Sequence, residues 1–498
     1  MRADADGRAR HIRESLALFV LTAWPAWAVS VPPLQDLPQH LASAFVEAHL
    51  GSYPAFVSNG FFKTNATLYL FLRLVAPLAG YRVAAKLFVT LTCAVGAYAY
   101  PRSVRAFGGN VQSASFLLLP FVHSWFVAMG MLDYALSVPL VLLALVELKP
   151  RPILASALAV LVWYTHAFGV VMLGLLVAIE VIATRRWRDV LPLVPAGALT
   201  LWSVVLQLGS ETHVSGATRM WQSVPALLYG AWAEWLWSLS KWTITSIAVV
   251  PVLVWFGARR FRERRTFFSP LAFGALVILY FALPYQWHHW YFVSSRVLPF
   301  VWFACLVRVG DLPRWARGAL GACAVAFSVG LGVEYVQNAR VWDGVCRGES
   351  AVPEGSRLLP MVFDRKGPHG DNTWPMPHVW GLYVIDRGVS APLVFAHSKS
   401  FMLRYAKEPE PRFHGITLEY FPQHHKTRAV YCEENHVVAG DCARAYDAAW
   451  REFWDAAAPR FDRVLMFGVT PDARAEIPKS FRVVFEEGET LILATGGA

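Results

Sequence analysis

The sequence predicts a polytopic α-helical membrane protein of about eleven transmembrane helices with a C-terminal extracytoplasmic α/β domain. Three observations predict this fold class. Of the 498 residues, 56% are hydrophobic and only 16% are charged, whereas soluble proteins average about 25% charged residues. The chain contains 21 Trp, and such rings are enriched where a membrane meets water. From about residue 341, polar sequence with Pro and Gly replaces the long apolar stretches.

The candidate transmembrane helices are apolar segments separated by short polar breaks. They are 14–31, 83–101, 113–129, 131–147, 152–165, 167–183, 190–208, 243–258, 267–284, 295–310 and 317–336. Several are shorter than the roughly 20 residues that a full crossing needs, so 152–165 and 167–183 could be half-length or re-entrant. A signal-peptidase cut after Ala28 would remove the first segment, but an uncleaved first helix gives the consistent span count.

Basic residues in the polar breaks predict the orientation of these helices. They lie at the N-terminus and around Arg102, Lys149, Arg186, Arg262 and Arg314. Cytoplasmic loops carry an excess of Lys and Arg, so we place all of these breaks, and the N-terminus, in the cytoplasm. An even number of crossings between them makes 113–147 and 152–183 hairpins and leaves the C-terminus outside. The net charge of +10 then reflects topology, and we expect no nucleic-acid partner.

Two segments on the predicted outer side, 32–82 and 209–242, are too long to be simple connections. Within the first, 37–50 and 66–79 carry helical apolar stripes, which suit amphipathic helices lying in the membrane interface. A further span at 66–79 would break the charge pattern. We therefore expect a transmembrane domain over residues 1–340 that includes both outer segments.

The remaining residues, 341–498, are expected to form the soluble extracytoplasmic domain. Short apolar runs predict strands at 358–363, 392–395, 463–469, 481–485 and 490–494. Residues 442–458 predict a helix, because Tyr446, Trp450 and Trp454 recur at four-residue spacing on one face. Strands with at least one helix indicate an α/β domain. Cys432 and Cys442 could form a disulfide outside the cytoplasm, although the sequence leaves their pairing open.

Ionisable residues that the topology does not explain gather at the predicted outer ends of the helices. The candidate site residues are Asp36, His40, Asp133, His166, His288, His289 and Arg296. Ionisable side chains near a membrane are costly and indicate a functional site. Each of them alone could be a packing or interface residue, but their convergence on one side favours a functional cavity.

Asp36 is the sharpest candidate, because it follows the first helix directly at the outer surface. A carboxylate there can accept a proton from a hydroxyl as a general base, or it can simply cap the helix that begins at Leu37. His40 lies one helical turn further and could share its face. Arg296 could grip phosphate oxygens bidentately or extend to the lipid headgroups.

The sequence does not indicate a tightly bound metal. It contains no His-Glu-x-x-His motif, and the first outer segment contains no Asp-x-Asp. We expect no cofactor, although a weakly held divalent cation is compatible with the acidic residues.

Several of these features together resemble the GT-C superfamily of membrane glycosyltransferases, in an uncharacterised bacterial branch. They are the stretch Asp36-Leu37-Pro38-Gln39-His40 in a long first outer loop, Tyr164-Thr165-His166-Ala167-Phe168-Gly169, and Arg296-Val297-Leu298-Pro299. Many members carry two acids in the first loop, whereas here only Glu47 follows Asp36, and Asp133 could supply the second from another outer turn.

The resemblance implies an inverting transfer of a sugar from a polyprenyl-phosphate donor, on the extracytoplasmic side of a bacterial inner membrane. The acceptor would be a hydroxyl of a glycan, lipid or protein. Asp36 and His40 would be catalytic. The substrate-binding residues would be Arg296, His166, Asp133, His288 and His289. Membrane lipid and the lipid-linked donor are the expected partners.

Two other functions remain open from the sequence. A transporter or lipid flippase predicts internal repeats and charges near the middle of the membrane, and neither is visible here. A non-catalytic membrane scaffold that presents the C-terminal domain predicts that replacing Asp36 has no effect on cellular glycans.

Overall fold

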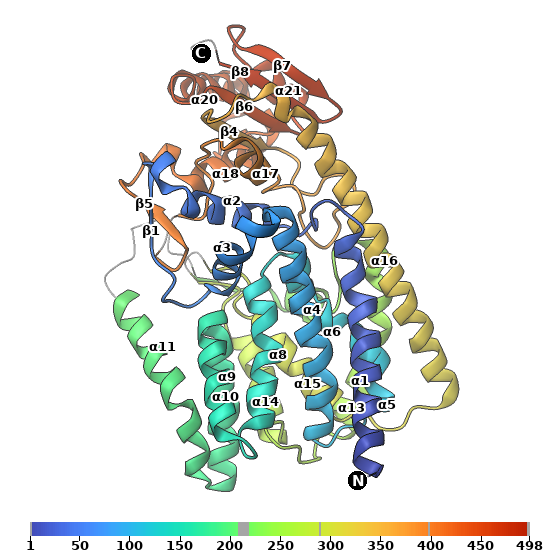
Figure 1. Ribbon diagram of the computed structural model, residues 1–498. Coiled ribbons are helices and arrows are strands. Elements are labelled where there is room, and N and C mark those ends of the chain that lie inside the picture. The colour runs from blue at the N-terminus through green and yellow to red at the C-terminus, as the bar shows by residue number, and fades with distance from the viewer. Residues whose placement is uncertain (1, 208–218, 288–289, 397–398, 496–498) are drawn as a thin grey trace.

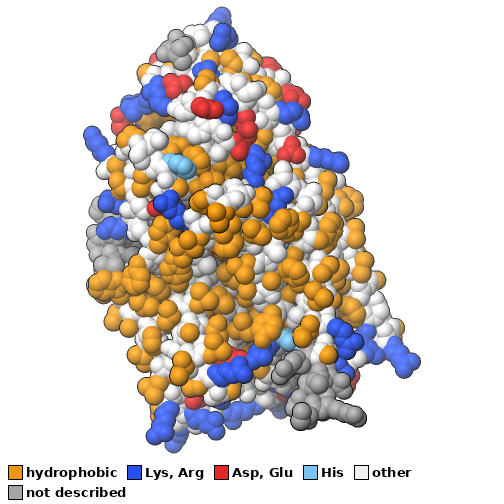
Figure 2. Space-filling view, viewed as in Figure 1, with side chains coloured by type: hydrophobic (Ala, Val, Ile, Leu, Met, Phe, Trp, Pro, Cys, Tyr) orange, Lys and Arg blue, Asp and Glu red, His pale blue; other side chains and the backbone are white. Residues whose placement is uncertain are grey.

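The protein consists of a helical bundle with a small β-sheet region at one end (Figure 1). The computed structural model describes residues 2–207, 219–287, 290–396 and 399–495. The N-terminus lies at the end of the bundle remote from the sheet, and the C-terminus lies beside the sheet. On the face that Figure 2 shows, a band of apolar side chains covers the bundle, with Lys and Arg concentrated below it and charges of both signs above it.

The bundle is built from helices of 9 to 33 residues. These are α1 (Arg2–Ala23), α4 (Tyr81–Ala106), α8 (Leu132–Glu147), α9 (Pro152–Thr165), α10 (Ala167–Thr184), α11 (Val194–Gln207), α12 (Val224–Ala233), α13 (Val249–Arg259), α14 (Pro270–Ala282), α15 (Leu298–Leu306) and α16 (Arg314–Cys346). Within the described residues, five helical stretches are long and apolar enough to cross a membrane, and six further apolar helices are shorter. The chain is thus an integral membrane protein, and the count of eleven crossings stays a prediction.

Two of the predicted hairpins differ in how well they match the structure. Helices α9 and α10 are separate, as predicted, because His166 between them adopts an extended backbone with φ −161° and ψ 127°. The segment 113–129 is not the continuous helix that we expected. It forms the short helices α5 (Val111–Ala114), η3 (Ser115–Leu117), α6 (Leu119–Val122) and α7 (Trp125–Ala128). The break comes at His123 and Ser124, whose backbones leave the helical region.

Helix α16 is much longer than the predicted span 317–336. Its 33 residues extend about 50 Å at 1.5 Å per residue, whereas the hydrocarbon core is about 30 Å thick. It therefore leaves the bundle and reaches the sheet region (Figure 1). The domain boundary expected at residue 340 falls inside this helix.

Both helices predicted in the first outer segment are present, as α2 (Leu37–Ala48) and α3 (Thr67–Ala79). Helix α2 packs against α17 (Gly381–Arg387) from the C-terminal region. The approach requires glycine, because a Cβ atom on Gly381 would lie 2.3 Å from the carbonyl oxygen of Pro38. Strand β1 (Phe56–Ser58) also pairs antiparallel with β5 (Leu403–Tyr405). The first outer segment and the C-terminal region are thus joined at two places.

The sheet after residue 341 has four strands in the order β4-β6-β8-β7. They are β4 (Leu358–Val362), β6 (Arg463–Phe467), β7 (Arg482–Glu487) and β8 (Thr490–Ala494). Strands β4 and β6 are parallel and the other pairs antiparallel. The strand predicted at 392–395 is wrong, since these residues form turns, and the carbonyl of Leu393 bonds to Gln39 instead of to a strand.

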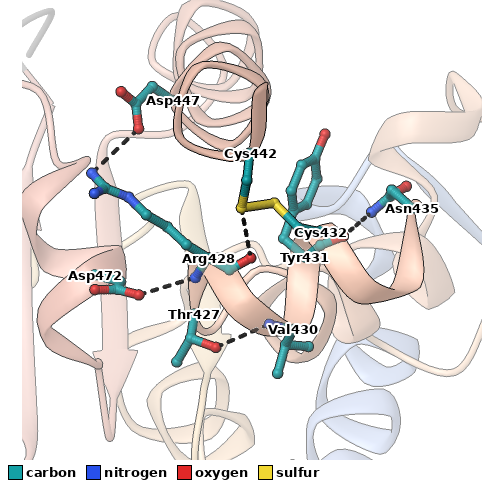
Figure 3. The surroundings of a disulfide bond; sticks show 9 residues. All are labelled: Thr427, Arg428, Val430, Tyr431, Cys432, Asn435, Cys442, Asp447 and Asp472. Atoms are coloured by element: carbon teal, nitrogen blue, oxygen red, sulfur yellow. Dashed lines mark hydrogen bonds and ion pairs between the residues drawn. A yellow bond between two sulfur atoms is a disulfide. The ribbon is translucent and has the colours of Figure 1, made fainter. Parts of the chain in front are cut away.

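Helices accompany this sheet, and the predicted helix 442–458 is confirmed. They are α18 (Gly415–His424), α19 (Arg428–Glu434), α20 (Cys442–Ala457) and α21 (Pro471–Ala475). Tyr446, Trp450 and Trp454 of α20 are all buried, as their spacing predicts. Cys432 and Cys442 form a disulfide that joins α19 to α20 (Figure 3), so the pairing that the sequence left open is confirmed.

The predicted basic breaks lie together at the end of the bundle that holds the N-terminus. Arg105 forms an ion pair with Glu14 of α1, and Arg102 forms one with Glu147 at the end of α8. Lys149 Nζ lies 3.5 Å from Glu180 Oε1 at the end of α10. The charge pattern therefore sorted these helix ends to one side correctly.

Candidate functional site

Asp36 lies immediately before α2, and the turn between α7 and α8 fixes its backbone. The Asp36 amide donates to the carbonyl of Met129 over 3.0 Å. The two backbones come so close that a Cβ on Gly130 would lie 2.8 Å from the Asp36 nitrogen. Gly130 also has a φ of +79°, which disfavours any other residue. Residues 129–130 are thus a rigid support for the start of α2.

The Asp36 side chain does not cap α2, because it makes no hydrogen bond to the helix N-terminus. Its Oδ1 lies 3.3 Å from Nε2 of His378 and 3.4 Å from Nε2 of Gln35. The side chain is 14% exposed. Capping therefore does not explain this carboxylate, whose contacts are compatible with a chemical role.

His40 lies one turn along α2, as predicted, with its ring beside the same site. Its Nδ1 lies 2.8 Å from the hydroxyl of Tyr69 in α3, and its ring centroid is 5.1 Å from that of Phe395. Burial lowers the pKa of His40 to about 4, although the nearby Asp36 acts to raise it. His40 is thus neutral at physiological pH and serves as a hydrogen-bonding group.

Asp133, at the start of α8, holds the N-terminus of α3. Its Oδ1 accepts a hydrogen bond of 2.9 Å from the amide of Leu68. A carboxylate at a helix N-terminus satisfies an orphan donor and complements the helix dipole. The structure thus gives Asp133 a structural contact, and its predicted substrate-binding role stays a prediction.

Arg296 is buried in an aromatic setting and does not extend to the headgroups. It is 7% exposed, and its guanidinium carbon lies 5.8 Å from the ring centre of Tyr134 and 5.7 Å from that of Trp290. Its Nε has no hydrogen-bond partner, and no ion pair joins Arg296 to a carboxylate in the described parts of the chain. A buried cation without a counter-ion is costly, which favours an anion-binding role.

His166 lies near Arg296, because both side chains contact the ring of Tyr134. The His166 ring packs edge-on against Tyr134 at 5.1 Å, and its Nδ1 accepts from the amide of Phe168 at the start of α10. His166 thus caps α10 while its ring borders the Arg296 cluster, which comprises Tyr134, His166, Trp290 and Arg296.

The predicted site residues therefore form two adjoining clusters. The Asp36 cluster comprises Asp36, His40, Tyr69, Asp133 and His378. It adjoins the Arg296 cluster because Asp133 and Tyr134 are consecutive on α8. His288 and His289 lie outside the described residues. Five of the seven predicted residues are thus brought together at the end of the bundle opposite the basic breaks.

Two residues with contacts here were missed by sequence reasoning. His378 comes from a turn of the C-terminal region, and no motif surrounds it. Glu234, just after α12, accepts a hydrogen bond from the hydroxyl of Ser295, next to Arg296. Burial raises the pKa of Glu234. Its position in the outer segment 209–242 was a signal that could have identified it.

A metal site is not evident among the side chains that the structure places. No three His, Cys, Asp or Glu residues within the described ranges lie close enough to hold an ion.

The fold that carries these clusters is similar to that of ArnT from Cupriavidus metallidurans, a GT-C family glycosyltransferase of which two crystal structures match. The form bound to undecaprenyl phosphate matches with a TM-score of 0.55 and 12% identity, over 99% of this chain and 98% of that chain. The apo form matches with a TM-score of 0.51 and 13% identity over the same shares. No family model and no curated protein matches the sequence.

Proposed function

We propose that this protein is an inverting glycosyltransferase that moves a sugar from a polyprenyl-phosphate donor to an acceptor hydroxyl. The observation that carries the proposal is Asp36. Its side chain is almost buried, it does not cap its helix, and it lies in a cluster adjoining a buried arginine that has no ion pair among the described residues. A base beside an anion-binding group is what transfer from a phosphate-linked sugar needs.

In the proposed reaction, the free carboxylate oxygen of Asp36 takes the proton of the acceptor hydroxyl. The acceptor oxygen then bonds to the anomeric carbon from the face opposite the phosphate. The bond between that carbon and the phosphate oxygen breaks, and its electron pair leaves with the phosphate. A single carboxylate suffices, because a phosphate leaving group needs little protonation, whereas glycoside hydrolysis uses two.

Arg296 would hold the donor phosphate. A guanidinium offers donors in a fork that matches phosphate oxygens, and that of Arg296 is buried among Tyr134 and Trp290 without a carboxylate partner in the placed residues. Support for a lipid-linked donor comes from the ArnT structure, which holds undecaprenyl phosphate. The proposed roles of His166, Asp133, His288 and His289 in substrate binding follow the same scheme, with the lipid tail held between the helices.

The proposed reaction takes place on the extracytoplasmic side of a bacterial inner membrane. Two observations support this orientation. The site lies at the opposite end of the bundle from the basic breaks, which the positive-inside rule assigns to the cytoplasm. The C-terminal region, which contacts the site, contains the disulfide of Cys432 and Cys442 (Figure 3), and disulfides persist outside the reducing cytoplasm. We propose the soluble domain 341–498 as the roof of the site, with no tightly bound cofactor and a divalent cation held weakly at most.

The test is sugar transfer by the purified protein with a series of polyprenyl-phosphate sugars. We expect Asp36→Asn to lower kcat at least about 10³-fold, since it removes the base. Glu47→Gln is the matched control, because Glu47 lies on the same helix but receives its hydrogen bond from Ser58, over 3.4 Å. It should retain full activity.

Equal transfer by wild type and Asp36→Asn would remove Asp36 as the base. Absence of transfer from every donor would instead favour a transporter, a flippase or a non-catalytic scaffold.

A further inference from the structure

A turn-rich segment of the C-terminal region, residues 372–395, binds the start of α2 on both sides of Asp36. The amide of Trp374 donates to Oε1 of Gln35 over 2.9 Å. The side-chain amide of Gln39 donates to the carbonyl of Leu393. His378 contacts Asp36 itself. Three of the five residues 35–39, at the start of α2, are therefore contacted by one segment that is distant in sequence. This segment is thus part of the site and not only a cover over it.

His378 is suited to orient a carboxylate. It is 5% exposed, and its Nε2 lies 3.3 Å from Oδ1 of Asp36. Its other ring nitrogen, Nδ1, is buried and has no hydrogen-bond partner in the described parts of the chain. A neutral imidazole has one donor and one acceptor nitrogen. Because Asp36 can only accept when ionised, the contact requires the proton on Nε2.

An aromatic pair, Phe395 and Phe401, lies beside the imidazole, with Phe395 in contact with its ring. The ring centre of Phe395 lies 6.0 Å from that of His378 and 5.1 Å from that of His40, and Phe395 stacks on Phe401 at 4.9 Å. The imidazole is thus packed in place, and its buried Nδ1 is not open to a substrate hydroxyl. The geometry therefore assigns proton transfer to Asp36 and a supporting part to His378.

We propose that His378 is a positioning residue for the general base, supplied by the C-terminal region. This inference rests on the proposed glycosyl transfer. The Nε2–H of His378 donates to Oδ1 of Asp36 and fixes the carboxylate plane, so that Oδ2 receives the acceptor proton. His378 neither gains nor loses a proton in this step. The new bond from the acceptor oxygen to the anomeric carbon and the departure of the phosphate proceed as described above.

The other titratable groups near this pair are His40 and Tyr69, with Asp133 beyond them. Asp36 acts to raise the pKa of His40, whereas His378 acts to lower it. Asp133 and Asp36 both act to raise the pKa of Tyr69. His40 is neutral and bonded to Tyr69, so His378 is the closest donor that a ring nitrogen offers to Asp36.

The experiment compares His378→Phe with His378→Gln in the full-length protein. Phe keeps most of the ring volume but removes the donor, whereas the Gln amide can place a donor near the position of Nε2. We expect His378→Phe to lower kcat on the order of 10²-fold, as misplacement of a reacting group does, with little change in the KM of the donor. His378→Gln should recover most of the activity.

His425→Phe is the matched control, since His425 is a half-buried histidine of the C-terminal region. It stacks on Phe421 at 3.9 Å and packs edge-on against Trp450, and its replacement should leave kcat unchanged. Wild-type kcat in His378→Phe would overturn the positioning role while leaving the proposed function intact. Equal loss in His378→Phe and His378→Gln would also overturn it, as this indicates a packing role. Failure of the wild type to transfer from any donor would instead refute the proposed function itself.

Discussion

Two buried arginines at opposite ends of α15 show how the two ends of the bundle differ. Arg296 precedes the helix at the site end, and Arg308 follows it at the basic end. Arg308 is completely buried, and its guanidinium donates to the carbonyls of Ala304 and Phe268 over 2.7 Å each. The Nε of Arg296 has no hydrogen-bond partner among the residues that the structure describes. The fold supplies acceptors to the guanidinium of Arg308, whereas Arg296 keeps a hydrogen-bond donor that no described residue accepts.

The same difference holds for the carboxylates at the two ends. Glu147 and Glu180, at the basic end, each have a cationic partner. Among the described residues, Asp36 contacts a histidine and an amide but no Lys or Arg. Natural structures satisfy nearly all buried polar groups, so the unpaired groups of the candidate site are compatible with a bound substrate. The comparison distinguishes residues that hold the bundle together from residues that we propose to contact a substrate.

Among the substitutions that test this comparison of the two ends, the largest effect on transfer should come from Arg296→Met, which removes the buried cation. We expect kcat/KM for the donor to fall on the order of 10²-fold, because a bidentate, charge-assisted contact to the phosphate is lost. Thermal stability without the donor should stay equal or rise, since an uncompensated buried charge is removed. Transfer kinetics and a melting curve measure the two effects. A large fall in melting temperature with normal kinetics would place Arg296 among the structural residues.

The same substitution at the other end, Arg308→Met, should have the opposite outcome. It leaves the carbonyl oxygens of Ala304 and Phe268 without these donors, which should cost about 2–6 kcal/mol of stability at roughly 1–3 kcal/mol for each group. The protein that remains folded should show wild-type kcat. A fall in kcat of the folded fraction, beyond any change in melting temperature, would contradict the division between the two ends.

Hydropathy and basic residues sort helix ends without any knowledge of packing. The sequence was therefore sufficient to place most of the candidate site residues at one end of the bundle. Asp36, His166 and Arg296 could be placed on one side for that reason. His378 could not be found, because it reaches Asp36 through packing of α17 on α2, and such distant pairing leaves no local pattern.

Local breaks in the helices were also beyond prediction. The segment around His123 is apolar throughout, so its composition favours a continuous helix. Its break follows from tertiary contacts, since His123 bonds to the hydroxyl of Tyr335 over 2.8 Å and the Trp125 amide bonds to the carbonyl of Trp235 over 3.0 Å. The full length of α16 could not be predicted, because its C-terminal end is polar and has the composition of a loop. In the structure this end is helical where it reaches the sheet region.

The smallest effect should come from Asp133→Asn. This substitution tests whether the charge of a carboxylate in the Asp36 cluster acts on the substrate when one of its oxygens already accepts a hydrogen bond from the protein. Asp133 lies in the Asp36 cluster, yet its Oδ1 is already bonded to the amide of Leu68. Asn keeps a carbonyl oxygen that can accept a hydrogen bond from the amide of Leu68 and from a substrate hydroxyl, so we expect kcat within about threefold of wild type and a stability loss below about 1 kcal/mol. Asp133→Ala should destabilise α3 by about 1–2 kcal/mol through loss of the cap. If Asp133→Asn instead loses activity as severely as Asp36→Asn while remaining folded, the charge of Asp133 acts on the substrate, and a satisfied hydrogen bond does not exclude a residue from the site.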